Sequence, residues 1–162
     1  MYRDKAVEKM REYFQEDRFI EHTLKVLARA ERICAGENID GAFIQQVATL
    51  GSIFHDIGIP EALKKHSSLE APYQEKEGPP VARRLMEEID VRPDIRERVC
   101  YIVGNHHTAE RVDGLDFQVI WEADFIVNID EGNIKLEPDE VKQAVEENLK
   151  TATGRTLIKE VL

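Results

Sequence analysis

Three histidines and one aspartate of this chain occupy helix faces that should point into the protein interior. Each shares its face with apolar residues at helical spacing along the sequence. These residues are His22, His55, His106 and Asp124. Burying a carboxylate or an imidazole without a partner is costly, because the group loses its hydrogen bonds to water. A divalent cation shared by the four residues would offset that cost, so the pattern predicts a metal site.

The dipeptide His55-Asp56 lies where one of these predicted helices ends. Adjacent residues on a helix point about 100° apart and normally cannot reach one ligand. Gly58 and Pro60 follow directly and indicate a helix terminus, where the second residue of the pair can turn back toward the first. A single inward histidine is more often a hydrogen-bonded core residue than a ligand. Four inward polar residues on four helices, with Asp56 beside one of them, favour a metal site.

Helical periodicity extends through most of the sequence and predicts an all-α fold. We expect about six to seven helices with short connections, because no stretch shows the alternation typical of strands. The expected helices cover residues 4–15, 19–36, 40–56, 74–89, 93–106, 115–128 and 138–150. Residues 60–73 are predicted as a loop with one short helical turn at most. Pro79-Pro80 predicts either a kink in the fourth helix or its true start.

The order and separation of the polar residues resemble the H…HD…D signature of the HD-domain superfamily of metal-dependent phosphohydrolases. The resemblance rests on His22, His55-Asp56 and Asp124, with the local sequences EHT (21–23), FHDIG (54–58) and EAD (122–124). It covers about residues 18–130. We therefore expect one HD-type domain over residues 1–162, in which residues 131–162 form a helical extension. This extension should pack against the domain or against a dimer partner.

The resemblance implies a bundle of helices around a metal ion. Its four ligands would be His22, His55, Asp56 and Asp124. Water activated by the metal would attack a phosphorus ester or anhydride, often in a nucleotide. His106 and His107 fall where some members of the superfamily bind further metal ions or position a phosphate.

Two departures from the multinuclear members of the superfamily favour a single ion. Gln74 stands where those members usually have a histidine, and Ile59 stands where they often have a lysine. No GYP sequence follows His107, which argues against a cyclic-dinucleotide phosphodiesterase.

The donor chemistry limits the metal and suggests roles for two residues. Imidazole and carboxylate together favour one divalent transition metal, Mn, Fe, Co, Ni or Zn, over Mg or Ca. Such an ion lowers the pKa of a bound water and polarises a phosphoryl oxygen. Asp56 is expected to bind the metal and to accept a proton from that water. His106 is expected to donate a hydrogen bond or a proton to the substrate, or else to orient a ligand.

An anionic phosphate substrate requires positively charged or hydrogen-bonding side chains near the metal. Our candidates for substrate binding are Arg18, Lys65, His66 and His107. Arg18 precedes His22 by one turn, and Lys65-His66 lies in the irregular segment after the HD motif. Weaker candidates are Lys25, Lys64, Arg83 and Arg84, since most basic residues of a chain are solvated surface charges.

The composition restricts the partners and the setting. The chain has 22 Lys and Arg against 32 Asp and Glu, a net charge of −10. Duplex nucleic acid is therefore disfavoured, because phosphate contacts need a basic surface. No apolar run approaches the roughly 18 residues that a membrane span needs. Cys34 and Cys100 form no metal-type pair, which favours a reduced, cytoplasmic setting, and a homodimer is compatible with the sequence.

Together these inferences predict a cytoplasmic phosphohydrolase that acts on a nucleotide or another small phosphate ester. One alternative is an iron-dependent oxidoreductase of the same fold, which Gln74 argues against because such enzymes generally use two ions. Another is a non-catalytic module that senses a nucleotide, which the complete ligand set argues against.

Overall fold

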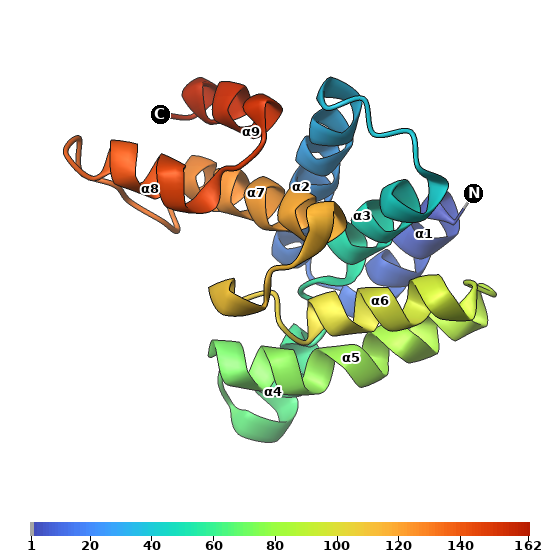
Figure 1. Cartoon of the computed structure of the whole chain (residues 1–162). Coiled ribbons are helices and arrows are strands. Elements are labelled where there is room, and N and C mark those ends of the chain that lie inside the picture. The colour runs from blue at the N-terminus through green and yellow to red at the C-terminus, as the bar shows by residue number, and fades with distance from the viewer. Residues whose placement is uncertain (1) are drawn as a thin grey trace.

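The computed structural model describes residues 2–162, and α-helices make up most of this range (Figure 1). No strand occurs among the described residues, so the predicted all-α class is confirmed. The helices are α1 (Arg3–Phe14), α2 (Asp17–Gly36), α3 (Ala42–Phe54), α4 (Ile59–His66), α5 (Ala71–Glu88), α6 (Pro93–Val103), α7 (Gly114–Asp130), α8 (Val141–Asn148) and α9 (Ala152–Leu157). Short 3-10 helices cover Ala109–Arg111 and Ile158–Glu160. None of the helices within residues 2–162 combines the length and the apolar character needed to cross a bilayer.

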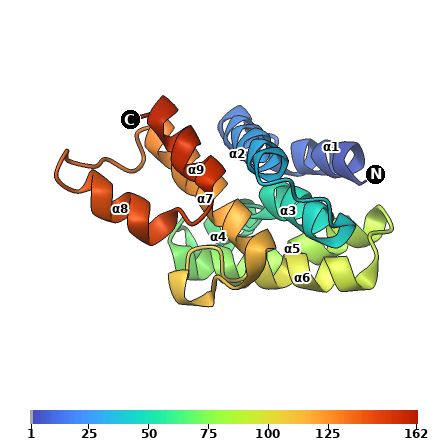
Figure 2. The same ribbon diagram turned by 45° about the horizontal axis from the view of Figure 1, so that its top comes forward.

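Helix α3 lies at the centre of the bundle and contacts α1, α2, α6 and α7. Figure 2 shows α3 between α1 and α2 on one side and α5 and α6 on the other. Its sequence contains no charged residue, and its C-terminal half is buried around the whole circumference. A helix that is apolar on all sides is stable only inside a protein. The end of α3 that leads to His55 is therefore fixed in the core.

Helix α7 packs against both α2 and α3 and separates two groups of buried apolar side chains. Phe117 and Ile120 belong to the group shared with α3, whereas Val119, Ala123 and Ile126 belong to the group shared with α2. The approach of α7 to α3 is close at Gly51, where a Cβ atom would collide with the side chain of Ile120. Gly51 lies one turn before His55, so this contact places α7 beside the end of α3.

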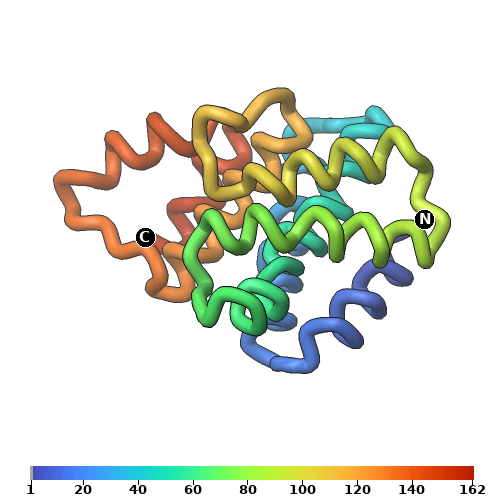
Figure 3. Tube along the Cα trace, turned by 90° about the horizontal axis from the view of Figure 1, so that it is seen from below, coloured from blue at the N-terminus to red at the C-terminus, as the bar shows by residue number. Residues whose placement is uncertain are grey.

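The residues after α7 fold back onto the domain through α8 and α9. Helix α9 contacts α2 and α7. The buried carboxylate of Glu122 on α7 accepts hydrogen bonds from Thr151 Oγ1 (2.6 Å) and from the backbone N–H groups of Lys150 (2.8 Å) and Thr151 (3.1 Å). The extension thus packs against the domain, which is one of the two arrangements expected. Figure 3 shows this part of the chain at the end of the molecule opposite the N-terminus.

Two segments are helical where the sequence predicts otherwise. Helix α4 occupies much of the segment 60–73, where a loop is expected. Helix α9 is an additional helix that the sequence does not predict. The sequence interpretation takes Pro60 as the end of the preceding helix. Instead, Pro60 lies in the first turn of α4, where the missing N–H of proline costs no hydrogen bond. A proline after an apolar run thus marked the start of a second helix.

Two other helix boundaries differ from the expected ones. Helix α5 begins at Ala71 and includes both Pro79 and Pro80, so the alternative start at Pro79 is wrong. Its packing against α4 and α6 outweighs the backbone hydrogen bonds that the two prolines remove. Helix α8 begins at Val141, because residues 138–140 form a turn rather than the expected first helical turn.

Candidate metal site

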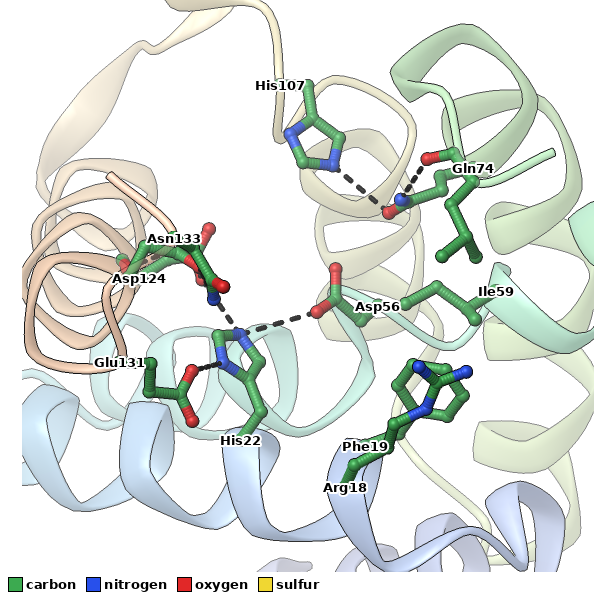
Figure 4. A pocket seen from close by; sticks show the side chains of 12 residues that line it. Arg18, Phe19, His22, Asp56, Ile59, Gln74, His107, Asp124, Glu131 and Asn133 are labelled. Atoms are coloured by element: carbon green, nitrogen blue, oxygen red, sulfur yellow. Dashed lines mark hydrogen bonds and ion pairs between the residues drawn. The ribbon is translucent and has the colours of Figure 1, made fainter. Parts of the chain in front are cut away.

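Polar side chains from four parts of the fold converge beside a cavity of about 450 Å³ (Figure 4). Helix α2 supplies His22, and α7 supplies Asp124. The turn after α3 supplies His55 and Asp56, and the turn after α6 supplies His106 and His107. The site therefore joins segments that lie about a hundred positions apart in the sequence, from residue 22 to residue 124.

The four residues of the expected ligand set lie in direct contact with one another. His22 Nε2 is 3.1 Å from Asp124 Oδ1 and 3.4 Å from Asp56 Oδ2. His55 Nε2 is 3.2 Å from Asp56 Oδ2 and 3.4 Å from Asp124 Oδ1. Ligand atoms of His22, His55 and Asp56 all lie within 4.8 Å of one another, so one ion can contact all three.

A tight turn explains how the adjacent residues His55 and Asp56 reach the same point. Helix α3 ends at Phe54, and the following hydrogen bonds run from Ile57 N to Phe54 O and from Ile59 N to Asp56 O, both 3.0 Å. These bonds span three residues rather than four, so the chain turns more sharply than in an α-helix. Asp56 is thereby directed toward the Nε2 side of His55, as expected for a pair at a helix terminus.

The Nδ1 atoms of the histidines are engaged in hydrogen bonds outside the cluster, and their Nε2 atoms face its carboxylates. His55 Nδ1 donates to Ser52 O and His106 Nδ1 donates to Val103 O, both at 2.7 Å. His22 Nδ1 donates to the carboxylate of Glu131 at 2.5 Å. Within residues 2–162, the buried Nε2 atoms of His55 and His106 have no hydrogen-bond partner. A neutral imidazole with Nδ1–H engaged in this way presents an Nε2 lone pair, which suits a metal ion.

Glu131 and Asn128 belong to the site, and the sequence interpretation does not include them among the site residues. Glu131 orients His22, and Asn128 Nδ2 donates to Asp124 Oδ1 at 3.0 Å. Carboxylates and amides in these positions hold ligands in place and increase their basicity. Asn128 follows Asp124 by four positions and Glu131 follows it by seven, which places both on the helix face of Asp124. Helical spacing could therefore have identified them.

The end of α7 places Glu131 and its neighbour Asn133 at the site. Gly132 has a positive φ of 77°. Its N–H donates to Ile129 O at 3.0 Å, while Asn133 N donates to Asn128 O at 2.8 Å. This hydrogen-bond pattern is the Schellman motif, in which glycine adopts the left-handed conformation that ends the helix. The chain therefore reverses at Gly132, and Asn133 returns toward Asp124 (Figure 4).

The charges of the cluster shift the pKa values of its members in opposite directions. Burial disfavours a proton on His55, but the adjacent Asp56 and Asp124 raise its pKa well above the usual value. Burial likewise opposes ionisation of the two carboxyl groups, yet the neighbouring histidines lower the pKa of both. For His22, burial again opposes the charge, and the hydrogen bond to Asp124 raises its pKa. Without a metal ion, protons on the histidines therefore supply the positive charge.

We expect the metal-free protein to lose stability as the pH rises above about 6.5. A histidine whose pKa is raised on folding stabilises the protein fully below its unfolded pKa, and this contribution is lost as the pH rises through the folded value. The two carboxylates, whose pKa values are lowered, contribute fully above about 4 and lose their effect on further acidification. The stabilisation by these four groups should therefore be greatest between these limits.

The stabilisation gained from metal binding should increase with pH, whereas the stability of the metal-free protein decreases. The reason is that the ion displaces the histidine protons. The measurement is the melting temperature of chelator-treated and Zn- or Co-loaded protein at several pH values between about 5.5 and 8.5. The increase caused by the metal should grow with pH. An increase that is the same at every pH would contradict this account of the cluster.

A second group of donor atoms, from Asp56, His106 and His107, also lies within 4.8 Å of one another. His106 Nε2 is 3.3 Å from Asp56 Oδ1. His107 Nε2, however, is 3.0 Å from Gln74 Oε1, while Gln74 Nε2 donates to Leu69 O at 2.6 Å. Since the amide nitrogen of Gln74 is engaged, its oxygen faces His107, and His107 Nε2 must carry a hydrogen. This arrangement leaves His107 only Nδ1 for a metal and is consistent with the single ion expected.

Two of the four residues expected to contact the substrate lie at the cavity, and two do not. Arg18 and His107 line the cavity, and the Arg18 guanidinium lies 4.4 Å from the centre of the Phe19 ring. Lys65 and His66 do not line it. Their side chains contact Glu77, at 3.1 and 3.2 Å, because α4 is a regular helix whose last turn faces α5.

The weaker candidates also have acidic partners or lie away from the cavity. Lys25 pairs with Glu131, and Arg83 and Arg84 pair with Glu97 and Glu88 on the protein surface. Lys64 is exposed and does not line the cavity. Arg18 is thus the one arginine or lysine that lines the cavity among the residues the structure describes.

The comparisons with known proteins agree with this geometry. The family model described as HD domain matches residues 19–154, which is most of the chain. Comparison with curated proteins gave no match, and neither did comparison with solved structures.

Proposed function

The chain belongs to the HD-domain family, which consists largely of metal-dependent phosphohydrolases, and we propose from this premise that it hydrolyses a nucleotide or another small phosphate ester. The observation that carries the proposal is the convergence of buried, unpartnered histidine Nε2 atoms with two carboxylates. Such an arrangement is costly in an apolar interior unless a cation completes it. His22, His55, Asp56 and Asp124 would hold that cation.

The donor set fits one divalent transition metal, chosen from Mn, Fe, Co, Ni and Zn. When bound, such an ion lowers the pKa of a coordinated water and withdraws charge from a phosphoryl oxygen. The two aspartates would balance the charge of the ion. The cavity beside it, at about 450 Å³, is in the range of small-molecule sites.

In the proposed reaction, the water oxygen forms a bond to phosphorus while the ester P–O bond breaks. Asp56 is suited to accept the water proton, because Oδ2 faces the histidine ligands while Oδ1 faces His106. His106 Nε2 lies 3.3 Å from Asp56 Oδ1 and can receive that proton. Since Nδ1 of His106 is engaged with Val103 O, His106 can act as a donor only after this transfer. It would then return the proton to the oxygen of the leaving group.

Arg18 is suited to bind the non-reacting phosphate oxygens or a further phosphate of the substrate. Its side chain is exposed at the rim of the cavity, where Nε donates to Glu16 at 3.1 Å. Replacing Arg18 with Gln should raise the KM for phosphate substrates about two- to fivefold and leave kcat nearly unchanged, because exposed ionic contacts contribute little. Steady-state kinetics would measure both constants.

The matched control for Arg18→Gln is Arg11→Gln. Arg11 is exposed on α1 and does not line the cavity, so its replacement should change neither constant. Equal KM values for Arg18→Gln and the unaltered protein would exclude Arg18 as a substrate contact.

The test of the proposed function combines metal analysis with assays of phosphate release. The protein should be purified without a histidine tag and assayed on a panel of nucleotides and simple phosphate esters with Mn, Co, Ni, Zn or Mg added. About one metal ion per chain with turnover of any substrate in the panel would support the proposal. Nucleotide that remains bound without hydrolysis would favour a sensing module instead.

An iron-dependent oxidoreductase remains the second candidate, and the donor group of Asp56, His106 and His107 favours it. This group could hold a second ion beside the first, with Asp56 contacting both. Two iron ions per chain, no phosphate release and oxygen consumption with an organic substrate would support this candidate. The hydrogen bond between His107 and Gln74 argues against it, because it leaves His107 only Nδ1 for an ion.

A further inference from the structure

A second cavity, of about 340 Å³, adjoins the metal site on the side of α7. We call it the Trp121 cavity. Trp121, Phe125 and Ile134 form its apolar walls. The residues that it shares with the metal-site cavity are His107, Asp124, Asn128 and Asn133. In Figure 4, Asp124 and Asn133 lie on one side of Asp56, and Ile59, Phe19 and Arg18 lie on the other. A substrate bound at the cluster can therefore extend in two directions.

The two cavities differ in the basic residues that line them. Arg18 lines the metal-site cavity, whereas no lysine or arginine within residues 2–162 lines the Trp121 cavity. Asp124 lines both cavities, and the metal-site cavity also contains the carboxylates of Asp56 and Glu131. Besides the ion, the cationic partner for further phosphates would therefore be Arg18, on the side away from Trp121. The Trp121 cavity is therefore suited to an uncharged part of the substrate.

Two aromatic side chains line the cavity and offer apolar surface to a planar group. Trp121 and Phe125 lie one helical turn apart on α7 and are both only partly buried. The indole is held by a hydrogen bond from Nε1 to Asn148 Oδ1 at 3.1 Å, and Asn148 Nδ2 is fixed by Ala144 O at 2.9 Å. Because the polar atom of the indole is already satisfied, the part of its surface that lines the cavity is available for apolar contact.

The amide of Asn133 adds a specific polar group to this surface. Its Nδ2 donates to Asn128 Oδ1 at 3.1 Å, and Asn128 Nδ2 in turn donates to Asp124. These bonds fix the orientation of the Asn133 amide. Its Oδ1 has no hydrogen-bond partner among the residues that the structure describes, so it can accept from an N–H group at the edge of a ligand.

We propose that the Trp121 cavity binds the base of a nucleoside phosphate, with the phosphate ester at the His/Asp cluster and any further phosphates toward Arg18. This inference rests on the proposed function for the position of the phosphate. It narrows the substrate class from phosphate esters in general to those of nucleosides. Stacking on aromatic side chains and an edge contact with an amide are the usual means of holding a base.

Trp121 is the one tryptophan of the chain, so its fluorescence reports directly on this cavity. The titration uses the four common nucleosides, their monophosphates and ribose 5-phosphate, with excitation at a wavelength that the nucleosides do not absorb. At least one nucleoside and its monophosphate should change the fluorescence saturably, and ribose 5-phosphate should not. No response to any nucleoside, or an equal response to ribose 5-phosphate, would overturn the proposal.

Phe125→Leu provides the variant test, because leucine keeps apolar volume and Trp121 remains as the reporter. The dissociation constant of the nucleoside should rise at least about fivefold, as expected when one stacking ring is lost. Asn133→Ala, in an exposed turn, should also weaken binding and does not disturb the core. Phe43→Leu, at an exposed phenylalanine outside the cavity, is the matched control and should have no effect. Unchanged binding by Phe125→Leu and Asn133→Ala would overturn the proposal.

The nucleoside titration also separates this inference from the proposed function. Nucleosides carry no phosphate, so their binding does not depend on hydrolysis. Saturable nucleoside binding without phosphate release would overturn the phosphohydrolase proposal and leave the base-binding cavity supported. Phosphate release from simple esters without nucleoside binding would give the reverse result.

Discussion

Replacing Asp124 with Asn should abolish metal binding at neutral pH. The substitution keeps the shape of the side chain but removes one of the two negative charges that face His22 and His55. Loss of groups that only orient a ligand lowers metal affinity about 10- to 100-fold, so loss of an anionic ligand should lower it more than about 100-fold. Phosphate release should fall to the background rate, because the reaction depends on the ion.

The Asp124→Asn variant should remain folded, since the amide oxygen can still accept the hydrogen bond from Asn128. Metal content after dialysis and the change in melting temperature on metal addition are the two measurements. The unaltered protein should be stabilised by the metal, as any ligand of the folded state stabilises it, and the variant should not.

Asp130→Asn is the matched control, because Asp130 lies exposed at the end of the same helix. It removes the same charge from α7 without contact with the cluster. If Asp124→Asn bound metal with the stoichiometry and affinity of Asp130→Asn, Asp124 would not be a ligand.

The residues of the cluster could be predicted because each breaks a local pattern. His22 and Asp124 interrupt apolar helix faces, and helical geometry alone places them in the interior. Glu131 and Asn128 follow the same geometry relative to Asp124, and extending the periodicity by two turns would have included them. Helical periodicity does not predict the direction in which the chain continues after α7. That direction depends on Gly132 and its positive φ.

The position of Lys65 and His66 away from the cavity has a different origin. Their types and their position after the HD dipeptide are compatible with a phosphate contact, but the orientation of α4 is set by residues remote in sequence. Glu77 on α5 faces the last turn of α4 and binds both side chains. The sequence does not indicate which acidic residue a basic one will meet when the two are on different helices.

The Trp121 cavity also depends on the fold rather than on a local signal. Trp121 and Phe125 are large apolar residues of α7 and are typical core residues by pattern. Both are only partly buried, and together with Asn133 and Ile134, which follow the turn at Gly132, they line a cavity. A cavity between two segments can be recognised only when the positions of both segments in the fold are known.

The largest effect on stability is expected for Gly58→Ala. Gly58 lies in the turn that follows His55 and Asp56, and its backbone packs against α5. A Cβ atom at this position would lie 2.6 Å from Gln74 O, 2.7 Å from Gly78 N and 2.8 Å from Gly78 Cα. All three are backbone atoms of a helix, so the clash cannot be relieved by a change of side-chain rotamer.

We expect Gly58→Ala to lower the free energy of unfolding by about 3 kcal/mol, at the upper end of the usual cost of overpacking. For a chain of this size, that corresponds to a melting temperature about 6–12 °C lower. Because the turn also carries Asp56, its displacement should weaken metal binding as well. Denaturant unfolding and metal titration of the same preparation would measure both effects.

Gly41→Ala is the appropriate control, because it makes the same chemical change at the other end of α3. A Cβ atom at Gly41 would have its nearest neighbour, Ile44 Cδ1, at 4.0 Å, which is ordinary van der Waals contact. Its effect should stay within about 0.5 kcal/mol, as for most surface substitutions. The contrast between the two variants isolates the contact of the turn with α5. If Gly58→Ala were as stable as Gly41→Ala and bound metal normally, this contact would not determine the position of Asp56.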